Sequence, residues 1–575
     1  MFSLDIARIP FSVRDSWLRI SRLGKEGGLA IHSLHGGFPQ VAMGQQVDEV
    51  SPNLFRIVLL VNGTVVEPEI DLQPHRLILR SGAAEVLIAF ADGSTIAFSG
   101  RGCAMRLEAM QSSGWVQARG AGDLLINLLR MPGCAHLRVE SGIPARLEEQ
   151  RIVEGHQVGQ TRAQAAFAVG DGRPWRAALR ISEAPTGWDG AVPEAAASAE
   201  RGLSELEVWM RRLPRVPAEF YDAACRAWHL MWMLQVPATG LLHRRSALMS
   251  KLWMNQVWSW DNCFMAIGYS HGDSELAWDQ VQVMLDHQTA EGQLPDTVND
   301  RERQYSFTKP PVYGWACGIL LDRLGEDACL DRLRQVHEPI ARLTGWWYRH
   351  RNASDLSPYY LHGNDSGWDN ATAYDQGFPT CGADLAALLV LQARFLARSA
   401  RLLGRTDEVG RWTDLAGRQL AALLRCNVRD GAFCSPHAVS GAAAPNASLV
   451  NRIPVILGAE LPEAILSRIA DDLRPDGRFV TSWGPATEAV DSPHYLADGY
   501  WRGPIWGPST YLLVDGLRRA GRRELGDEIA RRFCRLCAGD GVFWENYDAL
   551  SGAGLRCPGY SWTAATFLDL ATSLS

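Results

Sequence analysis

Residues 384–403 read DLAALLVLQARFLARSARLL, and residues 407–426 read DEVGRWTDLAGRQLAALLRC. In both stretches apolar residues recur at spacings of three and four, as Leu385, Leu388 and Leu389 do in the first. This period predicts amphipathic helices. Because only a plain turn separates the two stretches, we expect this part of the chain to consist of paired helices.

The same period recurs from residue 218 to the end of the sequence. Plain turns alternate there with loops rich in Gly, Pro, Trp, Asp and Asn. Repeated helical pairs over this length fit a closed ring of about a dozen helices, an (α/α)6 barrel or toroid, whose loops would pool at one end. The expected helices include 218–235, 274–290, 316–324, 330–350, 384–403, 407–426, 462–473, 508–520 and 523–537.

The N-terminal part of the sequence has the pattern of a β structure. Short apolar runs end at Asn62-Gly63 and at Asp92-Gly93. Asn-Gly and Asp-Gly between apolar runs indicate β-hairpins, so we expect an antiparallel β-sandwich. The expected strands include 54–61, 85–90, 115–118, 137–139 and 165–169.

A change of composition divides the chain. An Ala-rich helix begins near residue 194, and Pro214 and Pro217 interrupt it. We therefore expect an N-terminal β-sandwich domain at 1–205, a linker at 206–217 and a helical catalytic domain at 218–575. The sandwich carries no convergent acid, base or metal cluster, which favours a structural role for it.

The composition excludes several classes of partner. Hydrophobic residues make up 47% of the chain, charged residues 21%, and the net charge is −7. Arg residues are interleaved with Asp and Glu, so no basic stretch indicates a nucleic-acid partner. No apolar run approaches the ~18 residues of a membrane span, and the N-terminus lacks a signal pattern. We expect a cytoplasmic protein that binds neither nucleic acid nor membrane.

The cysteines do not indicate a metal site. Cys534 and Cys537 form a CxxC, but they lie in a stretch that is predicted to be helical, and neither a second CxxC nor a His pair completes a zinc site. No EF-hand spacing indicates a calcium loop. We therefore expect neither a metal nor another cofactor.

Tryptophan is in excess, with 21 Trp against 13 Tyr and 17 Phe. Many of these residues will serve the core, but a flat ring with one N–H donor also suits the apolar face of a sugar. The segment 258–264, WSWDNCF, combines two Trp with Asp261 and Asn262, which can bind hydroxyl groups. Helix capping by Asp261 or Asn262 is the structural alternative.

Two distant segments each place a carboxylate among aromatic and turn residues: 362–370, HGNDSGWDN, and 543–548, FWENYD. Hydrolysis of a glycosidic bond requires such a pair, one acid and one base or nucleophile. In the first segment Asp365 and Asp369 are nearly equal candidates for the acid. Trp368 can desolvate Asp369 and raise its pKa, whereas Asp365 can bind hydroxyls or steady the loop.

The second segment offers Glu545 as a base that activates water, because its neighbours can orient an ionised carboxylate. Asn546, Tyr547 and Arg502 are the expected orienting residues. Asp548 is the rival, although it lies in what is expected to be an ordinary turn.

Two basic residues stand among the loops. Lys309 precedes Pro310-Pro311, where a specific ion pair or hydroxyl contact competes with a solvated side chain. Arg502 lies among aromatic, Gly and Pro residues, where it can bind a carboxylate or sugar hydroxyls, or stack on a Trp as a structural residue.

Taken in order, the aromatic loops resemble the inverting α-glycosidases of glycoside hydrolase family 63 and the related trehalases. The resemblance is greatest to the mannosylglycerate and glucosylglycerate hydrolase-like members, and it covers about 255–565. The matching stretches are Trp260-Asp261-Asn262, Gly292-Gln293-Leu294-Pro295, Lys309-Pro310-Pro311, Ser366-Gly367-Trp368-Asp369-Asn370, Tyr500-Trp501-Arg502-Gly503-Pro504 and Glu545-Asn546-Tyr547.

This resemblance implies an (α/α)6 barrel and hydrolysis with inversion, with Asp369 as general acid and Glu545 as general base. It also implies sugar contacts, and other residues of the same loops extend the expected binding set. Together this set contains Trp260, Asp261, Asn262, Gln293, Lys309, Trp315, Asp365, Trp368, Asn370, Trp501, Arg502, Trp506 and Trp562.

The sequence therefore predicts an exo-acting, inverting α-glycoside hydrolase, an α-glucosidase that releases a monosaccharide from a short oligosaccharide or glucoside. One alternative is a sugar isomerase or epimerase on the same barrel, which would use His residues as acid and base. The other is a carbohydrate-binding protein without catalytic activity.

Overall fold

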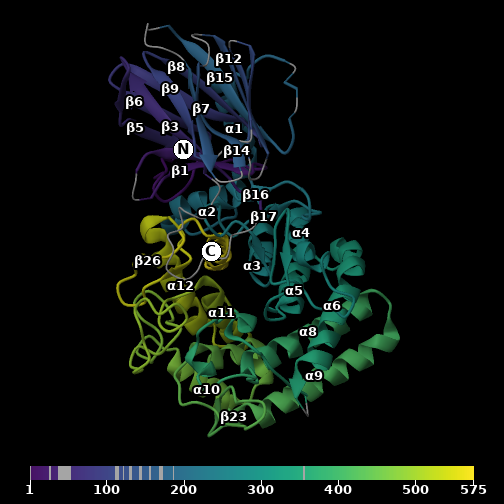
Figure 1. Ribbon diagram of the computed structural model, residues 1–575. Helices are drawn as coiled ribbons and strands as arrows, with labels where there is room; N and C mark the ends of the chain where they lie inside the picture. The colour runs from purple at the N-terminus through teal and green to yellow at the C-terminus, as the bar shows by residue number, and fades with distance from the viewer. Residues whose placement is uncertain are drawn as a thin grey trace.

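The computed structural model describes residues 2–24, 27–36, 53–110, 115–120, 122–128, 133–141, 146–154, 157–167, 173–185, 187–188, 190–353 and 356–575. For 141, 146–154 and 157–167 it describes the backbone alone. Strands gather in one half of the molecule and helices in the other (Figure 1). Within the described chain, we find no helix that combines the length and the apolar character needed to cross a membrane.

Two antiparallel sheets form the N-terminal region (Figure 1). One sheet runs, in spatial order, β1 (Leu18–Arg22), β2 (Leu29–Ser33), β3 (Asn53–Val61), β9 (Ala104–Ala109), β14 (Gln157–Phe167) and β13 (Arg146–Glu154), with β4 (Thr64–Val66) paired to β3. The other runs β10 (Val116–Gly120), β11 (Asp123–Asn127), β12 (Cys134–Ser141), β15 (Trp175–Ser182), β8 (Thr95–Arg101), β7 (Ala84–Asp92), β6 (Arg76–Ser81) and β5 (Glu69–Gln73).

The hairpins expected from the sequence are present. Asn62-Gly63 joins β3 to β4, and Asp92-Gly93 lies between β7 and β8. Gly63 has a φ of +77°, a conformation that favours glycine. The strand expected at 165–169 is present up to Phe167, and 168–169 lie outside the described residues. The strands follow period two, as in β9, where alternate residues are buried.

The C-terminal region is helical, and each helix expected from the sequence is present, with the expected bounds at 330–350 and with shifted ends elsewhere. Three helices, at 261–269, 363–366 and 561–573, and the 3-10 segment at 449–460 lie outside the predicted ranges. The helices are α1 (Ala195–Met210), α2 (Tyr221–Met233), α3 (Asp261–Tyr269), α4 (Ser274–Leu285), α5 (Tyr313–Leu324), α6 (Leu330–His350), α7 (Gly363–Ser366), α8 (Ala383–Leu402), α9 (Thr406–Cys426), α10 (Glu463–Asp472), α11 (Gly507–Arg519), α12 (Arg523–Asp540) and α13 (Ser561–Ser573), and the 3-10 segment η6 spans Leu449–Glu460.

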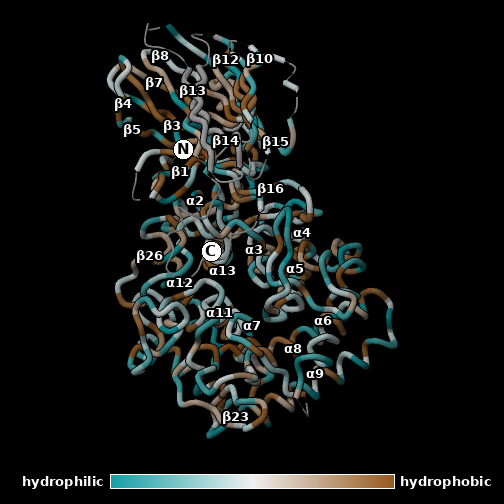
Figure 2. The backbone as a smooth tube through the Cα atoms, viewed as in Figure 1, coloured by the Kyte–Doolittle hydropathy of each residue, from teal (hydrophilic) through white to brown (hydrophobic). Residues whose placement is uncertain are grey.

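The inner helices contact one another in a circuit that runs α3, α5, α8, η6, α11, α13 and back to α3. Every residue of α3 is buried, which explains why a period of 3.6 residues does not reveal this helix in the sequence. Gly268 lets α3 approach α13 closely, because a Cβ there would lie 2.7 Å from that of Ala565. By contrast, α6 and α9 alternate hydrophobic and hydrophilic residues, as Figure 2 shows, and bury one face.

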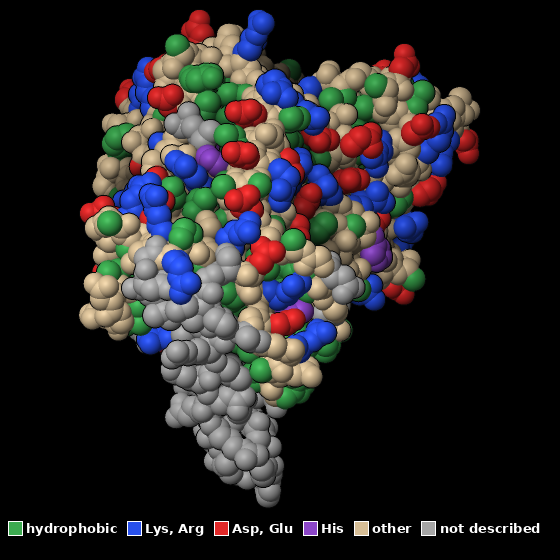
Figure 3. All heavy atoms as spheres, turned by 90° about the horizontal axis from the view of Figure 1, so that it is seen from above, with side chains coloured by type: hydrophobic (Ala, Val, Ile, Leu, Met, Phe, Trp, Pro, Cys, Tyr) green, Lys and Arg blue, Asp and Glu red, His purple; other side chains and the backbone are tan. Residues whose placement is uncertain are grey.

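The sheets and the helical region are joined by buried polar contacts. Lys251 is fully buried, and its Nζ donates to the carbonyls of Val13 (2.9 Å) and Ser16 (2.7 Å) and to Ser12 Oγ (3.2 Å). Burial lowers the pKa of Lys251 to about 7. The contact surface is thus fixed by directional hydrogen bonds as well as by apolar packing. On the face shown in Figure 3, Lys and Arg side chains are interspersed with Asp and Glu.

Candidate active site

Asp261 is the first residue of α3 and lies in the protein interior. Burial raises the pKa of its carboxyl well above the usual range, the Lys309 charge opposes this shift, and the charges of Asp296 and Asp369 add to it. The preceding residue, Trp260, has a φ of +67°, which is unfavourable for a bulky side chain. This backbone turn sets the direction in which Asp261 enters the site.

Lys309 is the centre of the charged cluster. Its Nζ lies 3.4 Å from Asp296 Oδ1 and donates a hydrogen bond of 2.6 Å to the carbonyl of Asn364. Burial would lower the pKa of Lys309, but the charges of Asp296, Asp369 and Asp261 raise it above the usual value. The specific ion pair, rather than a solvated side chain, is what the structure contains.

Asp365 orders the loop that carries Asp369. Its Oδ1 accepts from the backbone N–H of Thr308 (3.0 Å), and its Oδ2 accepts from Leu361 (2.9 Å) and His362 (3.1 Å). Both oxygens of this buried carboxylate therefore serve the backbone. Of the two roles expected for Asp365, loop stabilisation is the one that its contacts support.

Asp369 follows this loop and differs from Asp365 in its environment. It is partly exposed, and its carboxylate makes no hydrogen bond with the residues that the structure describes. Gly367, with a φ of +70°, faces the Trp260 ring so closely that a Cβ there would lie 2.6 Å from it. The Asp369 loop therefore packs directly on the loop that carries Asp261.

Glu545 lies in the second carboxylate segment and is 2% exposed. Its backbone N–H donates to the carbonyl of Cys557 (2.8 Å), while its Oε2 is buried without a hydrogen bond to any described residue. Burial raises the pKa of Glu545 to about 7, the charge of Arg556 and the Cys557 backbone oppose the shift, and the charge of Asp369 adds to it. Asp369 and Glu545 therefore lie within electrostatic range of each other.

The neighbours expected to orient Glu545 have other partners. Asn546 accepts a hydrogen bond from Arg556 (3.1 Å), and Tyr547 accepts one from the Trp544 N–H (3.1 Å). Arg502 binds Asp375 (2.5 Å) and the Asn370 carbonyl (2.6 Å), and the other Asn370 contacts are likewise to backbone. Asp548 accepts from Leu550 and Ser551, as expected of an ordinary turn.

Sequence reasoning missed two charged residues of the site. Arg556 binds Asp498 at 2.6 Å, lies 4.8 Å from the centre of the Tyr500 ring, and opposes the pKa shift of Glu545. Asp296, which pairs with Lys309, directly follows the Gly292–Pro295 stretch but is not among the residues expected to bind sugar. A Gly-Gln-Leu-Pro-Asp run could have indicated Asp296, whereas Arg556 follows an ordinary hairpin strand.

Two buried tyrosines lie within electrostatic range of carboxylates of the site. Burial raises the pKa of Tyr500 well above the usual range, and the charges of Asp369 and Glu545 add to this effect. Burial likewise raises the pKa of Tyr560, with contributions from Glu545 and Asp261. Both phenols therefore remain protonated and can donate hydrogen bonds.

Several residues of the expected binding set are packed inside the protein. Asn262 is fully buried, with its amide bound to the Gln280 carbonyl (2.8 Å) and to the Tyr313 hydroxyl (3.4 Å). Trp315 donates to Asp515 (2.8 Å), and Gln293 is partly exposed. The remaining tryptophans, at 1–4% exposure, form one ring cluster of Trp260, Trp368, Trp501, Trp506 and Trp562.

This buried tryptophan cluster supports the loops of the site by packing. Trp501 and Trp506 stack at 4.0 Å, and Trp368 lies 4.7 Å from Trp501. Trp506 donates to the Tyr500 carbonyl (2.9 Å), which fixes a residue whose φ is +64°. The contacts of these tryptophans support a packing role. This packing holds the neighbouring polar residues of the site in place.

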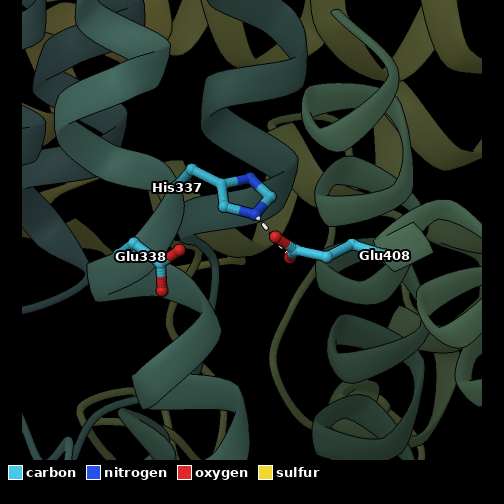
Figure 4. A group of neighbouring side chains, drawn as sticks. All are labelled: His337, Glu338 and Glu408. Atoms are coloured by element: carbon cyan, nitrogen blue, oxygen red, sulfur yellow. Dashed lines mark hydrogen bonds and ion pairs between the residues drawn. The ribbon is translucent and has the colours of Figure 1, made fainter. Parts of the chain in front are cut away.

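A candidate metal-ligating group lies elsewhere, on α6 and α9, and consists of His337, Glu338 and Glu408 (Figure 4). His337 already binds Ser399 Oγ through Nδ1 (2.9 Å) and Glu408 through Nε2 (3.0 Å). Arg405 pairs with both glutamates. These contacts satisfy the group without an ion, so it is a structural network between two helices.

Comparison with known proteins agrees with this arrangement. The family model described as mannosylglycerate hydrolase MGH1-like glycoside hydrolase domain matches residues 254–563, more than half of the chain. Mannosylglycerate hydrolase MGH1 of Selaginella moellendorffii is 23% identical over 392 residues, which cover 54% of this chain and 79% of that protein. The mannosylglycerate hydrolase of Rubrobacter radiotolerans is 24% identical over 409 residues and covers 54% of this chain and 90% of its own length.

Solved structures share the fold over part of this chain. The family 63 mannosylglycerate hydrolase from Thermus thermophilus, solved with Tris, has a TM-score of 0.52 at 20% identity and covers 60% of this chain and 98% of its own. Neutral trehalase Nth1 from Saccharomyces cerevisiae has a TM-score of 0.50 at 15% identity, with coverages of 58% and 74%.

The role of Asp365 can be tested by substitution. Asp365→Ala leaves three backbone N–H groups without their acceptor, so we expect the free energy of unfolding to fall by about 3 kcal/mol. Urea denaturation measures this change, with Asp548→Ala as the matched control in a partly exposed turn. Equal stability of the two variants would contradict the assignment.

Proposed function

The chain belongs to the mannosylglycerate hydrolase MGH1-like glycoside hydrolase family, and on this premise we propose that it is an exo-acting hydrolase that cleaves α-glycosides with inversion of the anomeric configuration. Asp369 protonates the leaving oxygen, and Glu545 deprotonates a water on the opposite face of the sugar. The observation that carries the proposal is the environment of Glu545, which is 2% exposed and whose Oε2 has no hydrogen bond to any described residue, so that this oxygen is free to accept a proton from a water.

The environments of the two groups suit different roles. Glu545 is buried, and the Arg556 charge favours its ionised form, which gives a base poised near neutral pH. Asp369 is partly exposed and free of hydrogen bonds among the described residues. Its carboxyl is therefore free to contact the leaving oxygen of a bound sugar.

The surrounding residues would bind the sugar that is released. Asp261 and the protonated hydroxyls of Tyr500 and Tyr560 would bind the hydroxyl groups of this sugar. Lys309 and Asp296 hold each other, and together they would hold Asp261 and the Asp369 loop in place. Asn262, by contrast, holds α3 against α4 rather than the sugar.

We infer that the substrate is an uncharged α-glucoside. In the described part of the site, each cation is already engaged by a carboxylate of the protein: Lys309 by Asp296, Arg556 by Asp498 and Arg502 by Asp375. An acidic aglycone would have to compete with these pairs, whereas a neutral sugar or alcohol would not.

Mannosylglycerate is the second candidate substrate, because several relatives carry that activity in their names. Purified protein can be incubated with α-linked glucose disaccharides, glucosylglycerate and mannosylglycerate, and the released sugar quantified. Turnover of the neutral disaccharides supports the α-glucosidase, and exclusive turnover of mannosylglycerate supports the second candidate.

The contacts of three histidines count against the isomerase alternative. His362 binds the Asn364 N–H and stacks on Phe307 at 4.8 Å. His271 pairs with Asp569, and His437 contacts the Phe378 carbonyl. Through these contacts the three side chains bind the loops and helices around them.

The proposed architecture follows from the same contacts. We infer an (α/α)6 barrel, because α3, α5, α8, η6, α11 and α13 contact one another in a circuit, with the other helices outside. We keep the division into a β-sandwich domain at 1–205, a linker at 206–217 and a catalytic domain at 218–575. The helix α1 continues across residues 205 and 206 and packs on both β7 and α2, so the first part of this linker is helical.

The acid and base can be separated by the leaving group. We expect Asp369→Asn and Glu545→Gln each to lower kcat/KM on an unactivated glucoside by about 10²- to 10⁴-fold. α-Glucosyl fluoride needs no protonation of its leaving group, so Asp369→Asn should hydrolyse it readily while Glu545→Gln should not. The reverse pattern would exchange the two roles, and full activity of both variants would refute the site.

The pH dependence follows from Glu545. The base must be ionised, and its pKa is about 7, so kcat/KM should fall as the pH drops below about 7. Arg556→Met removes a charge that lowers this pKa, and it should move the acidic limb of the profile to higher pH. Arg478→Gln, which breaks a pair with Asp491 on the surface, is the control and should leave the profile unchanged. An acidic limb near pH 4 in the wild type would contradict the assignment.

A further inference from the structure

The residues that follow strand β2 contact the helical region. His35 Nδ1 lies 2.7 Å from Asp300 Oδ2, and the backbone N–H of Gly36 donates to Asp300 Oδ1 (3.0 Å). Asn255 Nδ2 donates to the carbonyls of Leu34 (2.9 Å) and Gly36 (3.4 Å). Residues 34–36 thus form hydrogen bonds with both Asp300 and Asn255 of the helical region.

Both partners belong to a small sheet of β18 (Val257–Trp258), β19 (Thr297–Val298) and β20 (Arg303–Gln304) or to the residues beside it. Asp300 lies in the turn between β19 and β20, and its side chain is 1% exposed. Its carbonyl accepts from the Leu241 N–H (2.8 Å), which adds another fixed point. The turn is therefore fixed by hydrogen bonds from His35, Gly36 and Leu241 to Asp300.

Two acidic residues of the site lie beside this small sheet: Asp296 directly precedes β19, and Asp261 follows β18. The Ser259 N–H donates to the Asp296 carbonyl (2.8 Å), immediately before Trp260 and Asp261. The Asp296 carboxylate pairs with Lys309, which donates to Asn364 in the Asp369 loop. A continuous set of contacts therefore leads from the sheet region to the proposed acid.

The His35 ring is itself held in place. Trp17 stacks on it at 4.9 Å with the planes 20° apart, and Trp17 Nε1 donates to Thr239 Oγ1 (3.3 Å). A side chain fixed in this way can orient its partner before any substrate arrives.

From these contacts we propose that His35 and Asp300 are positioning residues of the hydrolase, through which the N-terminal sheet region holds Asp261 and Asp296 in their working geometry. The N-terminal region is then part of the catalytic unit. The inference rests on the proposed function, and it predicts that loss of the His35–Asp300 contact misplaces the site without unfolding the protein.

The experiment uses the full chain with four proteins: wild type, His35→Ala, His35→Asn and His136→Ala. Asn can place its amide near the position of Nδ1, so His35→Asn restores the donor. His136 is a matched control, because it is buried, binds Asp123 at 2.6 Å and lies wholly within the sheet region.

We expect His35→Ala to lower kcat/KM on the substrate of the wild type by about 10- to 100-fold, as a small displacement of site residues does. His35→Asn should recover to within about threefold of the wild type. His136→Ala should keep wild-type kcat/KM even if its Tm falls as much as that of His35→Ala. Activity of His35→Ala equal to that of His136→Ala, or failure of His35→Asn to recover, would overturn the proposal.

Hydrogen exchange provides a reading that needs no turnover. In His35→Ala the amides of Ser259, Asp296 and Thr308 should exchange faster than in the wild type, while in His136→Ala they should not. Unchanged exchange at these amides would overturn the positioning role whatever the substrate. Absence of turnover by the wild type, with the expected exchange pattern, would instead refute the proposed function alone.

Discussion

The buried ammonium of Lys309 is the interaction on which the site depends. A buried charge is tolerated only when it is paired, and Lys309 has three carboxylates within electrostatic range, those of Asp296, Asp369 and Asp261. These carboxylates come from separate loops that would otherwise repel one another. The ammonium therefore holds a cluster of negative charge in a small volume, which is the environment that the proposed chemistry requires.

The rest of the helical region supports this cluster through packing and strain. Trp260, Tyr500, Phe543 and Arg556 all have positive φ, and all belong to loops that face the carboxylates. Such conformations persist only where the surroundings fix them. The stacked tryptophans behind the loops and the short inner helices supply that rigidity, so the polar groups are already in place when a substrate binds.

The sequence predicts the elements well and the long-range pairs poorly. Amphipathic helices such as α6 and α9 are evident because one face is exposed, whereas α3 is buried on all sides and leaves no period to detect. Asp369 and Glu545 are identifiable from their aromatic neighbours and from family resemblance. The partners Arg556 and Asp296, the inward side chain of Asn262 and the backbone role of Asp365 depend on tertiary contacts that local sequence does not encode.

The stereochemistry of the reaction tests the central claim most directly. In the proposed mechanism water attacks the face opposite the leaving group, so the configuration of the sugar inverts in a single displacement. Proton NMR during the first minutes of hydrolysis of an α-glucoside identifies the anomer before mutarotation. The account predicts β-glucose as the first product. Initial release of α-glucose would mean retention, and with it a different role for Asp369 and Glu545.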